Sequence, residues 1–427
     1  MQSKSYLFFF LLIIIMAPAY NQQFFYTGNT ADLDTTPEFG ILLAGGGSDN
    51  DDGMQWLATR ANGGDVVVLR ASGSDGYNDY IYSELGVDLN SVTSILIVGS
   101  DEADTDTVCQ TVANAEMIFI AGGDQWYYYD EWKNTCLQAA LNSHVSDMKP
   151  IGGTSAGLAV LGEVVYTAEE GTVVSEEALG NPYHNRVTLA NDFLEVPFMG
   201  NIITDSHYHQ RNREGRHMAF LARIRKDWDM PAFGIGVNEY TAVAVDENGF
   251  ARVYGDPDYE DNAYFLRSNA LPEVCENGEP LHWDNNGQAV TAYVISGNHE
   301  ANNLFDLNSR HTGIGGEWQY WTVINGELSI ETDVDVSVPA ANQEKQVVIF
   351  PNPAEEQLNI RLKNNVSEEK NLLLQIKDIT GKTVTERKMN MRPVFKQDIS
   401  WLTPGIYMIF VRSKDYLLAK EVIIKKK

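Results

Sequence analysis

The most informative stretch of the chain is residues 150–161, which read Pro-Ile-Gly-Gly-Thr-Ser-Ala-Gly-Leu-Ala-Val-Leu. Apolar residues on both sides of the glycines predict a strand, a sharp turn at Gly153-Thr154-Ser155-Ala156-Gly157, and a helix. Glycine is needed at the first and last of these positions because a Cβ there would clash, and the turn lifts the serine hydroxyl above the sheet. The pattern favours Ser155 as a nucleophile over a purely structural glycine-rich turn, and the NH of Ala156 would face the oxyanion that develops on the substrate carbonyl.

The sequence around this turn alternates short apolar runs with amphipathic stretches. The runs are residues 41–43, 66–69, 95–98, 117–120, 151 and 202–204, and the helix-like segments are 53–61, 79–85, 105–113 and 126–145. This alternation predicts an α/β doubly wound fold with a mostly parallel sheet covered by helices on both faces. Such sheets carry their functional residues on the loops that leave the carboxyl ends of the strands.

A second loop of this kind is Gly122-Gly123-Asp124-Gln125, directly after the apolar run 117–121. Its glycines would allow a backbone NH of Gly122 or Gly123 to approach the oxyanion, and Gln125 would add a side-chain donor. The alternative is an ordinary turn in which Asp124 caps the next helix, and taken alone the segment favours that alternative.

A third loop follows the run 202–204 and begins Asp205-Ser206-His207. A serine hydroxyl needs a base to take its proton, and His207 is preferred over His209 because it follows the strand directly. The imidazole in turn needs a carboxylate that fixes its tautomer. Asp205 and Glu239 are both candidates, and their spacing in the sequence does not choose between them.

The same loop concentrates positive charge, since residues 211–226 hold six of the 14 basic residues between positions 20 and 343. Arginine binds a carboxylate through two parallel NH donors, so a cluster beside a nucleophile favours a substrate with free carboxylates. We assign this role to Arg211, Arg213 and Arg216. The alternative is a solvated basic helix face, which fits Arg223, Arg225 and Lys226 better.

With these three loops, residues 39–330 resemble the cyanophycinase branch of the peptidase E-like serine peptidases. That family has Gly-Gly-Thr-Ser-Ala-Gly around its nucleophile and an Asp-x-His-aromatic segment followed by three spaced arginines, matched here by Asp205, His207, Tyr208, Arg211, Arg213 and Arg216. The resemblance implies a class I glutamine amidotransferase-like fold. Relatives with a cysteine at the turn are amidotransferases, so Ser155 argues for peptide hydrolysis instead.

The resemblance also implies site roles and a substrate. The catalytic triad would be Ser155, His207 and Glu239, with Gln125, Asp205 and the three arginines lining the substrate site, no cofactor, and a homodimer as the usual assembly. Family members cut peptides at aspartyl residues, including β-linked aspartyl-arginine in cyanophycin. The sequence departs from the family at Ser206, usually glutamine, and at Glu214 and His217, usually apolar, which weakens the case for cyanophycin itself.

Composition and charge limit the classes of partner. The 427 residues are 44% hydrophobic and 21% charged, which excludes a disordered or collagen-like chain. The formal net charge of -28 makes nucleic acid and anionic membrane surfaces poor partners. The charge is uneven, because residues 344–427 hold 16 Lys and Arg against 10 Asp and Glu while the preceding residues hold 15 against 49. Two differently built parts are therefore expected.

The basic part is predicted to be a small C-terminal β-sandwich, residues 347–427, after a polar linker at 333–346 and a peptidase domain at 20–332. Phe350-Pro351-Asn352-Pro353, Leu402-Thr403-Pro404-Gly405-Ile406-Tyr407 and the terminal lysines are similar to the C-terminal sorting domain of type IX secretion. The resemblance implies the type IX secretion machinery as a partner. The alternative is a sandwich that binds carbohydrate or protein.

The first 19 residues are predicted to be a secretory signal peptide. Lys4 supplies a positive start, an apolar run follows at 7–16, and Ala17-Pro18-Ala19 offers a cleavage site. A retained N-terminal anchor is the alternative, and no later stretch is apolar enough to span a membrane. We therefore expect a secreted or cell-surface protein that passes through the periplasm.

Export permits disulfides, yet the chain has only three cysteines. Cys109 and Cys136 lie on consecutive helix-like segments and are suitably placed to pair, leaving Cys275 free. Three buried thiols remain an equal alternative. Acidic clusters such as 49–52 follow no EF-hand spacing, and no metal is assigned.

The leading hypothesis is thus a secreted serine peptidase that hydrolyses aspartyl bonds, β-aspartyl as in cyanophycin, through an acyl-enzyme. An aspartyl dipeptidase of the same fold is a close alternative. A non-catalytic surface protein that holds acidic ligands in the arginine pocket is the alternative from another class.

Overall fold

The computed structural model describes residues 23–332, 334, 347–351, 353–362, 371–378, 383–390, 394–412 and 417–425. The predicted signal peptide, residues 1–19, and the predicted linker 333–346 apart from Val334 lie outside these residues. Within the described part, none of the helices has both the length and the apolar character needed to cross a membrane.

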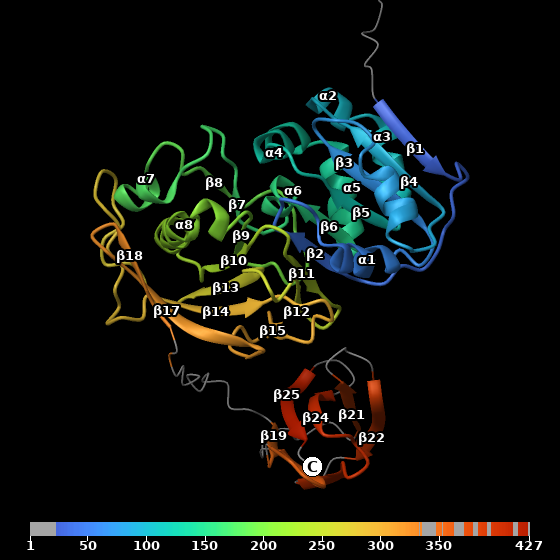
Figure 1. Cartoon of the computed structure of the whole chain (residues 1–427), viewed down its shortest axis with the longest axis vertical. Helices are drawn as coiled ribbons and strands as arrows, with labels where there is room; N and C mark the ends of the chain where they lie inside the picture. Colours follow the sequence, from blue (N-terminus) through green and yellow to red (C-terminus); the bar gives the residue numbers. More distant parts are fainter. Residues whose placement is uncertain are drawn as a thin grey trace, which may run out of the picture.

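The predicted fold class is confirmed in the largest sheet of the N-terminal part (Figure 1). Its centre is parallel, in the order β4-β3-β5-β6-β2, with strands β2 (Ile41–Ala44), β3 (Asp65–Arg70), β4 (Ser91–Leu96), β5 (Met117–Ile120) and β6 (Ile151–Thr154). These strands follow the predicted apolar runs except β4, which begins before the predicted run 95–98 and ends at Leu96. Antiparallel strands extend both edges: β1 (Gln23–Gly28) beside β4, and β11 (Ala242–Val245), β12 (Phe250–Tyr254), β15 (Leu304–Asp306) and β16 (Gly313–Ile314) beyond β2. Short loops join β11 to β12, as antiparallel pairing allows.

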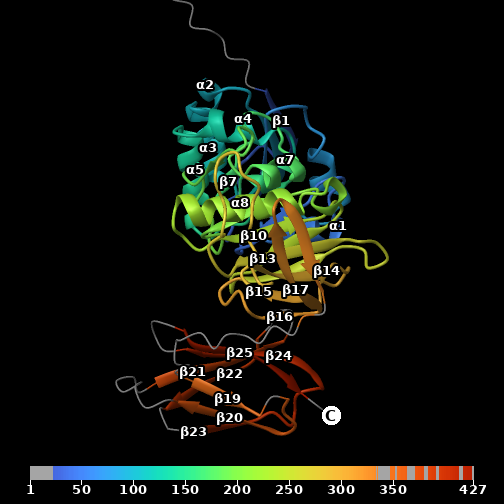
Figure 2. The ribbon, with the colours of Figure 1, turned by 90° about the vertical axis from the view of Figure 1, so that its left-hand side faces the viewer.

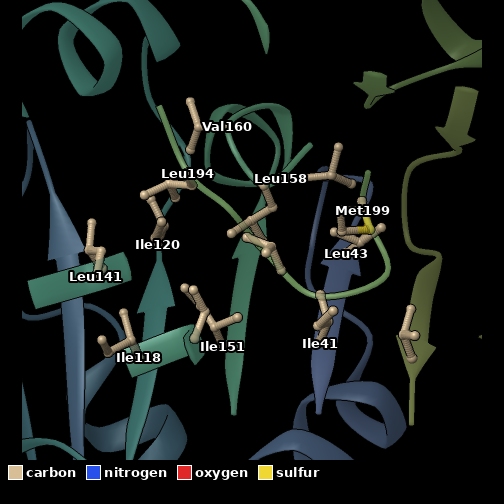
Figure 3. Packing of buried hydrophobic residues seen from close by; sticks show 14 of the residues in the cluster. Ile41, Leu43, Ile118, Ile120, Leu141, Ile151, Leu158, Val160, Leu194 and Met199 are labelled. Carbon is tan, nitrogen blue, oxygen red and sulfur yellow. The ribbon is translucent and has the colours of Figure 1, made fainter. Parts of the chain in front are cut away.

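Apolar side chains on alternate residues of the central strands pack on helices at both faces of this sheet. In β5, Met117 and Phe119 pack on the face covered by α1 (Asp51–Thr59), and Ile118 and Ile120 on the opposite face. Figure 3 shows Ile118 and Ile120 beside Ile151 and Leu158 in this second layer. The covering helices here are α2 (Ser100–Ala103), α3 (Asp106–Asn114), α4 (Gln125–Trp132), α5 (Cys136–Ser146) and α6 (Ala156–Ala159).

Two helix predictions need correction. The segment 126–145, predicted as one helix, is two, because Asn134 adopts a left-handed φ of 61° and Thr135 caps α5 with its side chain. Residues 79–85 contain a single π-helical turn, η1 (Tyr80–Glu84). The break before α5 brings Cys136 to α3, where it forms a disulfide with Cys109, and Cys275 is a buried free thiol.

The predicted strand 202–204 belongs to a second sheet rather than to the first. This sheet has the order β18-β17-β14-β13-β10-β9, and only β9 (Ile202–Asp205) and β10 (Phe233–Val237) pair in parallel. The other strands are β13 (Asn262–Ser268), β14 (Val290–Ser296), β17 (Gly316–Ile324) and β18 (Glu327–Glu331). Helices α7 (Ser175–Gly180) and α8 (Glu214–Asp227), the antiparallel pair of β7 (Val165–Tyr166) and β8 (Leu189–Ala190), and the turn η2 (His209–Arg211) complete this layer.

The C-terminal part consists of two small antiparallel sheets, as predicted (Figure 2). One contains β19 (Val347–Phe350), β20 (Gln357–Leu362) and β23 (Val394–Asp398), and the other β22 (Thr383–Asn390), β21 (Asn371–Asp378), β24 (Gly405–Arg412) and β25 (Leu417–Lys425). Buried apolar residues from both sheets, including Leu358, Ile360, Leu374 and Ile409, form one core.

Candidate active site

Ser155 lies in the sharp turn between β6 and α6. Its φ of 54° and ψ of -110° are strained for a residue with a side chain. Both flanking glycines are required, because a Cβ on Gly157 would lie 2.0 Å from the carbonyl oxygen of Ile120, and a Cβ on Gly153 would lie 2.5 Å from that of Gly157. The close approach of the turn to β5 therefore holds the serine in its strained conformation.

His207 is the partner of the serine hydroxyl, with its Nε2 2.8 Å from Ser155 Oγ. It follows β9, adopts a φ of 44°, and donates its backbone NH to the carbonyl of Gly45 at 2.8 Å. Gly46 lies directly beside the ring, since a Cβ there would be 2.6 Å from Nε2. Gly46 thus makes room for the imidazole, and Gly45 anchors the backbone of His207 while packing against the backbone of Asn238, where a Cβ would lie 1.8 Å from the carbonyl oxygen. The sequence analysis missed these roles although three successive glycines mark the loop.

Glu239, and not Asp205, is the carboxylate behind the imidazole. Its Oε1 lies 2.6 Å from Nδ1 of His207, and its backbone NH donates to the side-chain oxygen of Gln210 at 3.1 Å. In the tautomer favoured by this contact, Nδ1 carries the hydrogen and donates to Glu239. Nε2 is then free to accept the proton of Ser155.

Burial lowers the pKa of His207, and the nearby guanidinium groups of Arg211 and Arg213 lower it further, while the hydrogen bond to Glu239 opposes both effects. The net pKa lies below the ordinary histidine value of about 6.5. At neutral pH the imidazole is therefore uncharged and able to act as a base.

The hydroxyl of Ser155 faces a cavity of about 280 Å³. Four segments contribute its lining: the β5–α4 loop, the nucleophile turn, the loop after β7, and the end of β9 with the arginine loop. The lining residues are Gly123, Asp124, Gln125, Ser155, Ala156, Ala159, Tyr166, Ala168, Gly171, Thr172, Thr204, Asp205, Ser206, Arg211 and Arg213. The wall formed by residues 166–172 was not predicted, and no motif in the sequence marks it.

The predicted oxyanion residues lie near Ser155. Ala156 and Gly123 line the cavity, and Gly122 is adjacent, since a Cβ on it would lie 3.6 Å from that of Ser155. The Gly122 carbonyl accepts a hydrogen bond from Tyr128 at 3.1 Å. Asp124 caps α4 by accepting from the NH of Trp126 at 3.0 Å, and Gln125 donates to the carbonyl of Tyr166 at 3.4 Å.

The three predicted arginines differ in their environments. The side chain of Arg216 is 2% exposed and binds both carboxylate oxygens of Asp205, at 2.6 and 2.8 Å. That of Arg213 is 14% exposed and reaches Asp205 at 3.2 Å and the Ser206 carbonyl at 2.8 Å. That of Arg211 is 53% exposed, with Nε 3.8 Å from Glu239 Oε1. Arg216 is thus placed behind the cavity, whereas the other two arginines line it.

Electrostatics in this cluster follow from burial and pairing. Burial alone would raise the pKa of Asp205, but the charges of Arg216 and Arg213 outweigh it and hold the pKa below the ordinary value. Burial lowers the pKa of Arg213 to about 10, so its guanidinium remains charged at neutral pH. One carboxylate is therefore shared by two cations, the buried Arg216 and the partly exposed Arg213.

Two regions of the chain match known families. Residues 66–253 match Peptidase family S51, and residues 348–425 match the secretion system C-terminal sorting domain. Cyanophycinase from Synechococcus elongatus is 31% identical over 227 residues, which cover 50% of this chain and 65% of that protein. Cyanophycinase from Trichormus variabilis is 23% identical over 226 residues, covering 50% of this chain and 70% of that protein.

Two solved structures are similar at low sequence identity. A peptidase from an acI-B1 Actinobacterium is 17% identical with a TM-score of 0.38, and covers 52% of this chain and 89% of that one. A putative peptidase E protein from Listeria monocytogenes is 12% identical with a TM-score of 0.35, and covers 51% of this chain and 99% of that one.

Proposed function

We propose that this chain, which carries a peptidase family S51 domain at residues 66–253 and a secretion sorting domain at residues 348–425, is an exported serine peptidase. The observation that supports this function best is the continuous hydrogen-bonded series Ser155, His207 and Glu239, in which Ser155 faces a cavity that Arg211 and Arg213 also line. Its substrate is an aspartyl peptide, with a β-aspartyl bond as the first candidate, as the cyanophycinase relatives suggest.

The reaction follows from the roles of these side chains. His207 Nε2 takes the proton of Ser155 as Oγ bonds to the carbonyl carbon, and Glu239 stabilises the imidazolium. His207 then gives the proton to the departing amine, which leaves an acyl group on Ser155. Water, deprotonated by the same nitrogen, adds to the acyl carbon, and the proton returns to Oγ as the carboxylic acid departs. The NH groups of Ala156 and of Gly122 or Gly123 stabilise the negative oxygen in both additions.

The strained turn at Ser155 has the features of a nucleophile elbow, the strand-to-helix turn that presents a catalytic serine. A left-handed φ at both Ser155 and His207 fixes the two reacting atoms 2.8 Å apart before substrate binds. This preorganisation removes the need to orient them during the reaction.

We assign binding of the substrate carboxylate to Arg211 and Arg213. Both line the cavity, and Arg211 is the most exposed of the three arginines in the loop. Arg216 stabilises the loop through Asp205 instead of contacting substrate. Asp205 is correspondingly a positioning residue, which holds Arg213 against the cavity wall.

A fluorophosphonate probe and defined dipeptides test the proposed function. We expect stoichiometric labelling of Ser155 and release of free aspartate and arginine from β-aspartyl-arginine. Activity limited to α-aspartyl dipeptides would favour the dipeptidase, and release of dipeptides from cyanophycin would favour the polymer-degrading enzyme. A chain that does not react with the probe and cleaves neither the aspartyl dipeptides nor cyanophycin would contradict a catalytic role and favour the ligand-binding alternative.

The labelling rate should depend on pH through His207. Because its pKa lies below the ordinary value, the base is uncharged and effective at neutral pH, and the rate falls as acidification protonates it. Arg211→Gln removes a positive charge that lowers this pKa, so the acid side of the profile should move to higher pH. Lys226→Gln is the control, because it removes the same charge from an exposed side chain that does not line the cavity. An unchanged profile in Arg211→Gln would contradict this electrostatic coupling.

A further inference from the structure

The sorting domain spans residues 347–425, and its strand β24 is apolar on both faces. Tyr407, Ile409 and Val411 point into the core between the two small sheets, whereas Met408 and Phe410 lie in a different cluster and are also buried. The outer face of a two-sheet sandwich normally meets water and carries polar residues on alternate positions. The outer face of β24 is therefore built to be covered.

The peptidase part of the same chain covers it. Met408 and Phe410 pack on Phe250 of β12 and Leu304 of β15, and Ile314 of β16 is partly buried against them. The rings of Phe250 and Phe410 meet edge to face, with centroids 6.0 Å apart. Figures 1 and 2 both place β24 and β25 beside β15.

A buried lysine adds polar interactions to this apolar contact. Lys377 of β21 is paired with Met408 across the sheet and is only 8% exposed. Its Nζ lies 3.6 Å from Glu247 Oε1 and 3.4 Å from Asn248 Oδ1, both in the turn between β11 and β12, and 5.4 Å from the Phe410 ring centre. The pairing agrees with the charge of the two parts, since residues 344–427 are net basic and the preceding residues strongly acidic.

We propose that the sorting domain binds the peptidase domain through the outer face of β21 and β24, so that the two domains move as one body while the tail is attached. Phe250 and Leu304 are the apolar anchors on the peptidase side, and the Lys377–Glu247 pair sets the orientation. No residue named in this contact lines the active-site cavity, so docking leaves the cavity open. Removal of the tail uncovers apolar surface on β12 and β15.

Small-angle scattering and limited proteolysis of the full chain test this contact. Met408→Asp combined with Phe410→Asp places two charges in the contact, and we expect a larger radius of gyration and a several-fold faster cut by proteinase K between residues 332 and 347. Val384→Asp is the matched control, because it adds a charge to an exposed position on β22 of the same sheet. The control should scatter and be cut as the wild type is.

A charge reversal keeps the test decisive if the double aspartate variant misfolds. Lys377→Glu should loosen the contact, and adding Glu247→Lys should restore the wild-type scattering and cutting rate, because the pair is then re-formed with opposite signs. Unchanged scattering in both the aspartate variant and Lys377→Glu would overturn the proposal, as would a failure of Glu247→Lys to rescue. Fluorophosphonate labelling should be equal in all these variants. The test of the domain contact is therefore independent of the test of the proposed function.

Discussion

Ser155→Ala should abolish fluorophosphonate labelling. It should also lower the rate at which an aspartyl peptide substrate is hydrolysed by roughly 10⁶-fold. The alanine removes the only atom in the series that forms the bond to the carbonyl carbon, and members of such a series act as a unit. His207→Ala should therefore cost about as much as Ser155→Ala, and the double variant little more. Mass spectrometry of the labelled protein and an assay of released amine measure the two effects.

The control for this prediction is Ser206→Ala, because Ser206 is also a serine in the cavity lining. Among the residues that the structure describes, its hydroxyl has Arg213 as its one hydrogen-bond partner, at 3.4 Å, and its loss should change the rate by a few-fold at most. Folding of both variants is checked by their melting temperatures. Hydrolysis at the wild-type rate by Ser155→Ala, or labelling that persists at another residue, would contradict the proposed nucleophile.

The residues brought together at the site were predictable because short segments carry them. The glycine pattern around Ser155 predicted the turn, and the structure shows the reason in the carbonyl oxygens of Ile120 and Gly157, which leave no space for a Cβ. The position of His207 followed from its place at the end of a strand. Glu239 could not be separated from Asp205 by spacing, because Asp205 ends β9, Glu239 follows β10, and these two strands are neighbours in one sheet.

Features that depend on distant parts of the chain were not predictable. Residues 202–204 were expected to add one more strand to the first sheet. Instead β9 pairs with β10 in a second sheet, because a run of apolar residues does not specify its partner. The sequence does not distinguish the three arginines from one another, and only the fold shows that Arg216 is buried against Asp205. The wall at residues 166–172 and the glycines at 45 and 46 act through three-dimensional contacts with Arg216 and His207, which no local pattern records.

The second large effect concerns stability, and it arises from the buried pair of Asp205 and Arg216 at the cavity wall. Asp205→Asn should lower the free energy of unfolding by about 3–5 kcal/mol at pH 7, because it leaves the guanidinium of Arg216 buried without a counter-charge. Arg213, which shares the same carboxylate, would be left as a second cation beside it. Denaturant unfolding measures this loss, and labelling of the folded fraction measures how far the cavity is disturbed.

A double-mutant cycle separates the lost charge pair from simple loss of packing. Adding Arg216→Met to Asp205→Asn removes the stranded cation while keeping apolar volume, so the double variant should be more stable than Asp205→Asn alone. The pH dependence gives a second readout, because the pKa of Asp205 is held below its ordinary value and its contribution is present at neutral pH and lost as pH falls through the folded-state pKa. The difference between wild type and Asp205→Asn should therefore shrink on acidification. A difference that is absent at pH 7, or that grows at low pH, would mean that Asp205 does not hold the arginine loop through its charge.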